Sequence, residues 1–175
     1  FKKNKIETIS GFGKLAGKGQ VEVTDEAGTK TMVTAKHIIL ATGARTRQLP
    51  NLPLDYKKVF GYRKAMTLPS QPKSMVVVGS GAIGSEFAYF YQSVGTAVTL
   101  VEFMPNVVPL EDEEVSKQLE RSFKKMGMKV MTSSTVEKVD TSGELCKVTI
   151  KTKKGEEVVE ADVVLSAVGI TPNTE

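Results

Sequence analysis

The sequence contains few of the residues that disulfide-bonded and metal-binding proteins require. It has one cysteine and one histidine. The single cysteine, Cys146, excludes an intrachain disulfide and a thiolate metal cluster, and it suits a reducing compartment, so we expect a cytoplasmic protein. The acidic run at 111–114 is accompanied by no histidine or structured loop. It favours helix-dipole compensation over a metal site, and we predict no metal.

Long apolar runs and basic tracts are also absent. No stretch approaches the roughly 18 consecutive apolar residues that a membrane span requires, so we expect no membrane partner. The net charge of +4 comes from lysines scattered along the chain, which favours a solvated surface over a nucleic-acid-binding face. With 40% hydrophobic and 25% charged residues, the composition is that of a globular protein. The chain begins at Phe1, not at a methionine, and we expect an internal fragment of a longer protein.

The most informative pattern is a glycine motif between two apolar runs. Met75–Val78 is short and rich in β-branched residues, which predicts a buried parallel strand. Three glycines follow it and open a helix predicted over 82–94: Gly79, Gly81 and Gly84. In such a unit the first glycine makes a tight turn, the second admits a pyrophosphate and the third lets the helix pack closely on the strand. The motif therefore predicts a dinucleotide site at the positive end of the helix, with a ligand-free turn as the alternative.

A carboxylate ends the second predicted strand, at 97–101. Glu102 lies 18 residues (102 − 84) beyond Gly84, close to the spacing expected of an acid that binds ribose. Such an acid accepts hydrogen bonds from both ribose hydroxyls and repels a 2′-phosphate. A site for NADP would need nearby cations, and 103–110 contains none. The motif favours NAD over NADP, whereas FAD, which uses a similar fold and acid, stays possible.

A weak internal duplication indicates the domain organisation. The apolar segments Ala35–Gly43 and Ala161–Gly169 are both predicted strands that end in Ala-x-Gly. A predicted β-hairpin precedes each, with strands at 20–24 and 30–34 in the first copy. In the second copy the hairpin strands are predicted at 146–150 and 156–159.

Only the second copy is preceded by a complete strand–glycine motif–helix–strand unit. We therefore predict an α/β fold containing one Rossmann-like dinucleotide-binding domain, with a parallel sheet, helices and a β-meander, at 73–175. The back part of another such domain is predicted at 1–48, with a linker at 49–72 where prolines mark extended connections. A second helix is predicted over 111–126. Two such domains in tandem imply two dinucleotides that exchange electrons.

These features together resemble the pyridine nucleotide–disulfide oxidoreductase family. The likeness is carried by 11–14, 38–43, 77–87 and 95–103, and it extends over all 175 residues. It implies that 1–48 is the C-terminal part of an FAD-binding domain and that 73–175 is the NAD-binding domain. The implied cofactors are NAD and, in the full-length parent, FAD.

Within the family, the motifs are most similar to the branch that oxidises dihydrolipoamide. That resemblance implies a homodimeric parent enzyme that passes a hydride from FAD to NAD as a component of 2-oxo acid dehydrogenase complexes. A mercuric reductase or a transhydrogenase of the same family, and a non-catalytic NAD-sensing module, stay as alternatives. Family members also carry a Cys-x4-Cys disulfide and a His–Glu pair, neither of which occurs here. His37 and Cys146 are interpreted as an edge and a packing residue, so we predict no catalytic residue and an inactive fragment.

The resemblance also assigns binding residues by position. Those implied for NAD are Gly79, Ser80, Gly81, Ala82, Ile83, Gly84, Ser85 and Glu86 along the pyrophosphate and nicotinamide, Glu102 at the adenosine ribose, Val136 at the adenine and Gly169 near the nicotinamide. Those implied for FAD are Gly13, Thr42, Gly43 and Ala44. A carboxylate on the second helical turn is not needed for phosphate binding, and Glu86 is implied to support the nicotinamide–flavin junction.

Overall fold

The structure is a computed structural model that describes residues 1–174, so the last residue of the predicted NAD domain, Glu175, lies outside the described residues. The chain forms two compact units. One spans Phe1–Thr42 and the other begins at Gly43.

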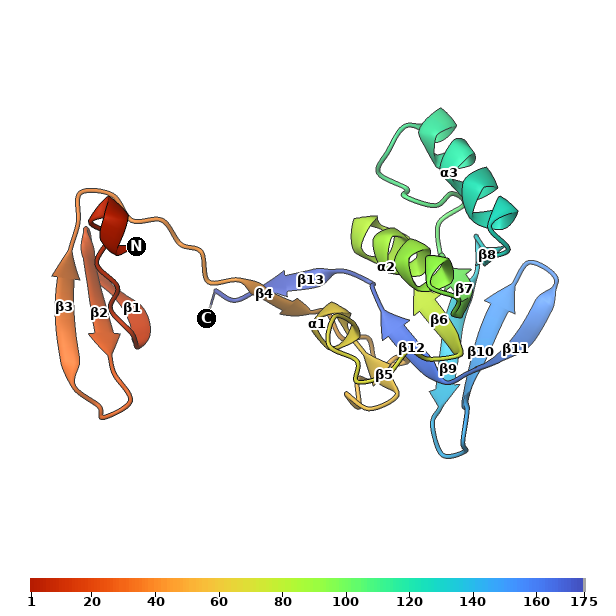
Figure 1. The fold of residues 1–175 in the computed structure, drawn as a ribbon, viewed down its shortest axis with the longest axis horizontal. Coiled ribbons are helices and arrows are strands. Elements are labelled where there is room, and N and C mark those ends of the chain that lie inside the picture. The colour runs from red at the N-terminus through yellow and green to blue at the C-terminus, as the bar shows by residue number, and fades with distance from the viewer. Residues whose placement is uncertain (175) are drawn as a thin grey trace. The chain divides into compact units, whose positions relative to one another are not determined.

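The first unit is a three-stranded antiparallel meander (Figure 1). Its elements are η1 (Lys2–Asn4), β1 (Phe12–Gly17), β2 (Gln20–Thr24) and β3 (Lys30–Thr34). The hairpin predicted over 20–34 is confirmed, with Gln20 opposite Thr34 and Thr24 opposite Lys30. No residue of this unit is buried, because a single small sheet has no second layer to pack against.

The strand predicted at Ala35–Gly43 is not formed, and that prediction is wrong. Residues 35–43 belong to no strand, and the side chains of Ile39 and Leu40 are 90% and 64% exposed. An apolar strand of this kind is stable only between hydrogen-bonded neighbours, and no described strand lies beside it. The matching segment in the second unit has neighbours on both sides and forms β12 (Val163–Ser166).

The second unit is built on a five-stranded parallel sheet of order β5-β12-β6-β7-β8, which confirms the predicted α/β fold (Figure 1). Its strands, besides β12, are β5 (Val59–Phe60), β6 (Ser74–Val78), β7 (Ala97–Val101) and β8 (Lys129–Met131). Two long helices connect the strands, α2 (Ala82–Ser93) after β6 and α3 (Glu113–Lys125) after β7. The carboxylate of Asp112 caps α3 by accepting a hydrogen bond from the Glu114 backbone N–H at 2.8 Å.

The two faces of the sheet carry separate cores. On β6, Met75 and Val77 pack with Tyr91 of α2 and Phe123 of α3. The alternate residues, Val76 and Val78 among them, pack against a β-meander on the other face. This meander consists of β9 (Thr135–Asp140), β10 (Cys146–Thr152) and β11 (Gly155–Ala161). The hairpin predicted in the second copy is therefore also confirmed.

Residues 49–72, which the prolines mark as a linker, pack within the second unit. They include β5 and α1 (Tyr62–Ala65), and Leu52 and Phe60 are both buried in its cores. Just before them, β4 (Ala44–Thr46) pairs with β13 (Ile170–Pro172). The segment is therefore part of the folded unit, unlike the extended connection that the sequence pattern predicts.

Candidate functional site: a pocket at the switch point of the sheet

The site lies where the chain order of the parallel sheet reverses. From β6 the chain continues outward to β7 and β8, and it returns to β12 on the other side of β6. In open α/β sheets, ligands bind in the crevice outside the carboxyl ends of the strands at such a point. A pocket of about 570 Å³ opens there, which lies within the range of small-molecule sites. We call it the switch-point pocket, and seven predicted residues line it: Gly79, Gly81, Ala82, Ile83, Glu102, Val136 and Gly169.

The three glycines of the motif each meet a different steric condition. Gly79 has φ +96°, and a Cβ there would lie 2.5 Å from the carbonyl oxygen of Ala167. A Cβ on Gly84 would lie 1.8 Å from the Gly79 carbonyl oxygen, so only glycine allows the helix to approach the strand. A Cβ on Gly81, which lines the pocket, would meet no atom within 4 Å. The open space at Gly81 is where a ligand can approach the backbone.

The amino end of α2 faces the same pocket without a capping side chain. Gly81 is the N-cap residue, no side chain hydrogen-bonds there, and the first turn contains no acidic residue. The first N–H groups of a helix have no partner inside the helix, and they carry the positive end of its dipole. The arrangement suits a phosphate group, and it agrees with the space left by Gly81.

Glu102 follows β7 and is buried, with 6% of its surface exposed. Its Oε2 atom accepts hydrogen bonds from the backbone N–H and the hydroxyl of Ser80, at 2.7 and 2.8 Å. Its Oε1 atom accepts one from the backbone N–H of Met104 at 2.7 Å. Donors therefore surround the carboxylate, which ties the end of β7 to the glycine loop after β6.

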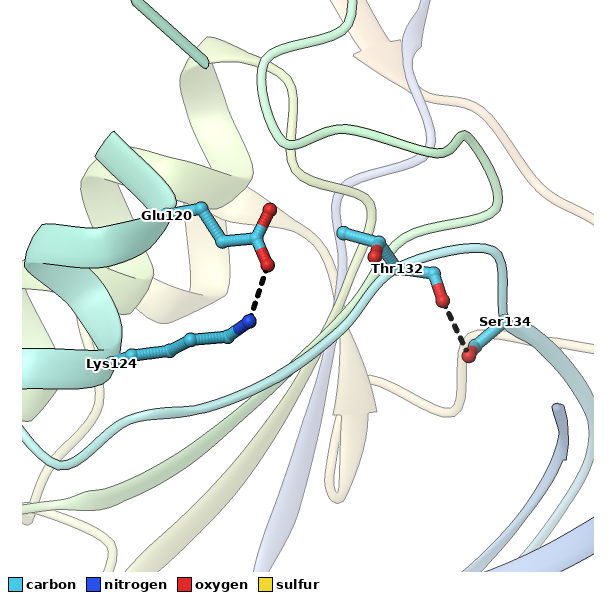
Figure 2. A network of polar contacts seen from close by, with 4 residues as sticks. All are labelled: Glu120, Lys124, Thr132 and Ser134. Carbon is cyan, nitrogen blue, oxygen red and sulfur yellow. Dashed lines mark hydrogen bonds and ion pairs between the residues drawn. The ribbon is translucent and has the colours of Figure 1, made fainter. Parts of the chain in front are cut away.

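The far end of the pocket is apolar and is built partly from residues that the sequence analysis missed. Val136 is the second residue of β9 and is 3% exposed, and Leu49 and Leu52 lie in the same lining. The Asn51 side-chain amide donates to the Val136 carbonyl at 2.5 Å. Upstream of β9, the hydroxyl of Ser134 donates to the Thr132 carbonyl at 2.9 Å, as Figure 2 shows together with the Lys124–Glu120 ion pair of α3.

Arg47 is a second residue that the sequence analysis missed. Among the described residues that line the pocket, it carries the only positive charge and Glu102 the only negative one. Its backbone N–H donates to the Gly169 carbonyl at 3.0 Å, and its Cδ would be 3.8 Å from a Cβ on Gly169. Arg47 therefore lies beside Gly169, in the segment that follows β12. The position of Arg47 depends on the pairing between β4 and β13, and no local sequence pattern predicts that pairing.

Other predicted residues lie outside the lining of this pocket. Ser80, Gly84 and Ser85 are buried beneath it, whereas Glu86 is exposed on the second turn of α2. Of the residues implied for FAD, Gly13 lies in β1 and Thr42 ends the first unit. Gly43 and Ala44 lie in the second unit. The Ala44 carbonyl accepts hydrogen bonds from the side chains of Tyr62 and Arg63. The Gly43 carbonyl accepts one from the backbone N–H of Asn173. Their roles stay predictions.

Three further features bear on the chemistry that the chain can perform. Burial raises the pKa of the Cys146 thiol, an effect that the positive charge of Lys58 only partly opposes. Cys146 is therefore poorly suited to act as a thiolate nucleophile. Within residues 1–174, no three side chains of the kinds that bind metals are grouped together. None of the helices in that range is long and apolar enough to cross a membrane.

The parallel sheet, the glycine loop and the strand-end acid define a Rossmann-type dinucleotide-binding protein. The chain belongs to the pyridine nucleotide-disulphide oxidoreductase family, whose model matches residues 1–175. Membership of this family implies a pyridine nucleotide and FAD as cofactors.

Curated relatives are similar over nearly the whole chain. A mitochondrial dihydrolipoyl dehydrogenase of Pisum sativum is 42% identical over 99% of the chain and 35% of its own length. A leghemoglobin reductase of Glycine max is 41% identical, with 99% of the chain and 34% of the relative covered. A dihydrolipoyl dehydrogenase of Zymomonas mobilis is 41% identical, with 99% and 38% covered. The chain therefore spans little more than a third of the length of these relatives.

Solved structures have the same fold. LpdA from Mycobacterium tuberculosis superposes with a TM-score of 0.81 at 30% identity, covering 95% of this chain and 37% of that protein. A ferredoxin reductase from Rhodopseudomonas palustris gives a TM-score of 0.77 at 27% identity, covering 99% and 44%.

Proposed function

We propose that the second unit binds NAD(H) as the pyridine-nucleotide half of a flavoprotein of the dihydrolipoamide dehydrogenase type. The observation that carries this proposal is the switch-point pocket, in which an uncapped helix end, the open space at Gly81 and the carboxylate of Glu102 face one cavity. These are the features that a dinucleotide with a free adenosine 2′-hydroxyl requires.

Each part of the pocket suits one part of the dinucleotide. The backbone N–H groups at the start of α2 and the guanidinium of Arg47 would hold the pyrophosphate. Glu102 would accept a hydrogen bond from the adenosine ribose, and its charge disfavours a 2′-phosphate. The adenine would lie against the apolar wall that includes Leu49, Leu52 and Val136. Gly169, at the end next to Arg47, would pass close to the nicotinamide.

NAD supplies a hydride-accepting ring when it is bound, and the chain contributes orientation and electrostatics. Ala82, which is exposed at the start of α2, leaves the approach to the ring uncovered by any large side chain of its own. Glu86, one turn further along α2, supports the junction with the flavin in this proposal. We also propose that four residues contact FAD in the parent enzyme: Gly13, Thr42, Gly43 and Ala44.

The parent protein would oxidise dihydrolipoamide, form a homodimer and take part in 2-oxo acid dehydrogenase complexes. The identity of about 40% with dihydrolipoyl dehydrogenases supports this choice. A cytoplasmic location is proposed from the single cysteine, and the similar proteins include mitochondrial and bacterial ones. The 175-residue chain itself is expected not to oxidise dihydrolipoamide, because its only cysteine cannot form the redox disulfide and His37 has no catalytic partner acid. Its affinity for FAD is expected to be weak or nil.

Titration calorimetry of the chain with NADH and NADPH tests the proposal. We expect NADH to bind more tightly, since Glu102 disfavours the 2′-phosphate. The double variant Glu102→Ala with Phe103→Arg should shift the preference toward NADPH, because it removes a negative charge and adds a positive one at the exposed lining residue Phe103. Equal affinities in the unmodified chain, or an unchanged ratio in the variant, would contradict the assignment of Glu102.

A further inference from the structure

Ser80 connects three parts of the second unit through hydrogen bonds. Its side chain is fully buried, and its N–H and hydroxyl both donate to Oε2 of Glu102. Its carbonyl accepts from the backbone N–H of Val108 and from the hydroxyl of Ser85, each at 2.9 Å. The N–H, the hydroxyl hydrogen and the carbonyl of Ser80 are therefore all hydrogen-bonded within the protein, and Ser80 is not among the residues that line the pocket.

The bonds to Glu102 limit what that carboxylate can offer. A carboxylate oxygen has two lone pairs. The two donors of Ser80 occupy those of Oε2, whereas Oε1 has one donor, the N–H of Met104. Oε1 therefore has more acceptor capacity left for a ribose hydroxyl than Oε2.

We propose that Ser80 is a positioning residue that sets the preference of the pocket for NAD(H) over NADP(H). This inference rests on the proposed function. The two hydrogen bonds from Ser80 hold the Glu102 carboxylate in place, because rotation of that side chain would leave the buried N–H and hydroxyl of Ser80 without an acceptor. A carboxylate held in place keeps Oε1 toward the ribose and keeps its charge where a 2′-phosphate would have to bind.

The chain contains a comparable serine–carboxylate pair at the start of β6, where Ser74 Oγ also accepts a hydrogen bond from the Asp162 backbone N–H at 3.0 Å. The N–H and the hydroxyl of Ser74 both donate to Oδ2 of Asp162, at 2.7 and 3.0 Å. Ser74 and Asp162 do not line the switch-point pocket. Ser74→Ala therefore removes the same kind of serine–carboxylate bond from β6 without touching Glu102.

The experiment measures NADH and NADPH affinities of the chain, S80A and S74A by titration calorimetry, with thermal melting of each as a check on folding. We expect S80A to lower the NADH-to-NADPH affinity ratio roughly five- to tenfold, because Glu102 loses one of its fixed donors and can move. S74A should be destabilised but should keep the ratio. The ratio is the decisive quantity, since a merely structural defect lowers both affinities together.

An unchanged ratio in S80A would overturn the inference while leaving the proposed function intact, provided that the unmodified chain binds NADH. An unmodified chain that does not bind NADH would instead overturn the proposed function, and this inference with it. If S80A does not fold, Ser80→Cys fills the site with a slightly larger thiol that is a weaker donor. A ratio in S80C equal to that of the unmodified chain would equally contradict the role of the hydroxyl.

Discussion

The side-chain amide of Asn51 donates a hydrogen bond to the carbonyl oxygen of Val136 at 2.5 Å, across 85 positions of sequence. Both residues line the switch-point pocket. The bond connects the segment before β5 to β9, the first strand of the meander, so that a stretch predicted to be a linker forms one wall of the site. The pocket is thus closed by tertiary contacts as well as by the glycine motif.

Alanine substitutions at two of the motif glycines should have opposite consequences. Gly84→Ala places a Cβ against the backbone carbonyl of Gly79, which cannot move without displacing the strand end. We expect a loss of about 3 kcal/mol or more in the free energy of unfolding. Gly81→Ala has room for its Cβ and should leave stability within about 0.5 kcal/mol. It should nevertheless weaken NADH binding at least roughly tenfold, because the methyl group fills the approach to the pyrophosphate.

Urea denaturation and NADH titration of both glycine variants check this prediction. A stable G84A would contradict the steric argument, and tight NADH binding by G81A would contradict the placement of the pyrophosphate.

Removal of the positive charge of Arg47 should weaken dinucleotide binding. We expect Arg47→Ala to lower NADH affinity roughly tenfold, since a charge-assisted bond to the pyrophosphate is lost. Arg47→Lys should restore part of the loss, because it keeps the charge without the planar fork. The control is Arg45→Ala, two residues earlier on β4, where the guanidinium donates to the Asn173 side chain and lies outside the pocket lining. Titrations at low and high salt should show a weaker salt dependence in R47A than in R45A, and equal dependence would count against the contact.

Asp55 should make the stability of the second unit depend on acid pH. Its Oδ1 atom accepts hydrogen bonds from the backbone N–H groups of Lys57, Lys58 and Val59, each at 2.8 Å. Partial burial alone would raise the pKa of Asp55, but the backbone donors and the charge of Lys57 outweigh it and lower the pKa below 3.8. A lowered pKa in the folded state contributes stability above the ordinary carboxyl pKa of about 4, and this contribution is lost as pH falls through the folded value.

Asp55→Asn should therefore cost about 0.5–1 kcal/mol of unfolding free energy at pH 7, and the cost should shrink as pH falls below 4 toward the lowered pKa of the folded state. Urea denaturation across this pH range measures the difference. A difference that stays constant with pH would show that the charge of Asp55 does not stabilise the turn.

The amides of the first unit should exchange hydrogen faster than those of the parallel sheet. The meander at 12–34 has no buried residue, whereas β6 and β7 are almost entirely buried. Local opening of the meander exposes little apolar surface and so costs little free energy. Hydrogen exchange with mass spectrometry on a verified monomer checks this, and protection at 12–34 equal to that at 74–101 would contradict it.

The central unit of the fold was predictable because its signals are local in sequence. The run at Met75–Val78, the glycine spacing and the acid at Glu102 lie within one strand–helix–strand unit, and the structure forms that unit as expected. Both helices were also predicted within two residues of their observed ends. The apolar side chains at the end of α2 are only partly covered, because Phe90 and the C-cap residue Val94 are 55% and 47% exposed. Helical periodicity identifies an apolar face but does not say how far the neighbouring layer extends over it.

Features that depend on distant partners could not be predicted from the sequence. Arg47, Leu49 and Asn51 reach the pocket only because β4 pairs with β13 and Leu52 packs under the meander. The strand expected at 35–43 had the same local pattern as β12 but lacks neighbouring strands among the described residues. The same kind of information was missing in both cases, since a sequence pattern does not specify which segments become neighbours.

Ser74, at the start of β6, is hydrogen-bonded to Asp162, and Ser80, in the glycine loop two residues after β6 ends, is hydrogen-bonded to Glu102. These two serine–carboxylate contacts together fix the number of residues between Ser74 and Ser80. One inserted residue would lengthen the strand by about 3.3 Å, more than a hydrogen bond tolerates, and would turn its valines toward the wrong core. Changes in chain length should therefore be excluded from β6 and tolerated in exposed turns such as 153–154. The length of the segment from Ser74 to Ser80 therefore determines where the glycine loop lies at the edge of the sheet.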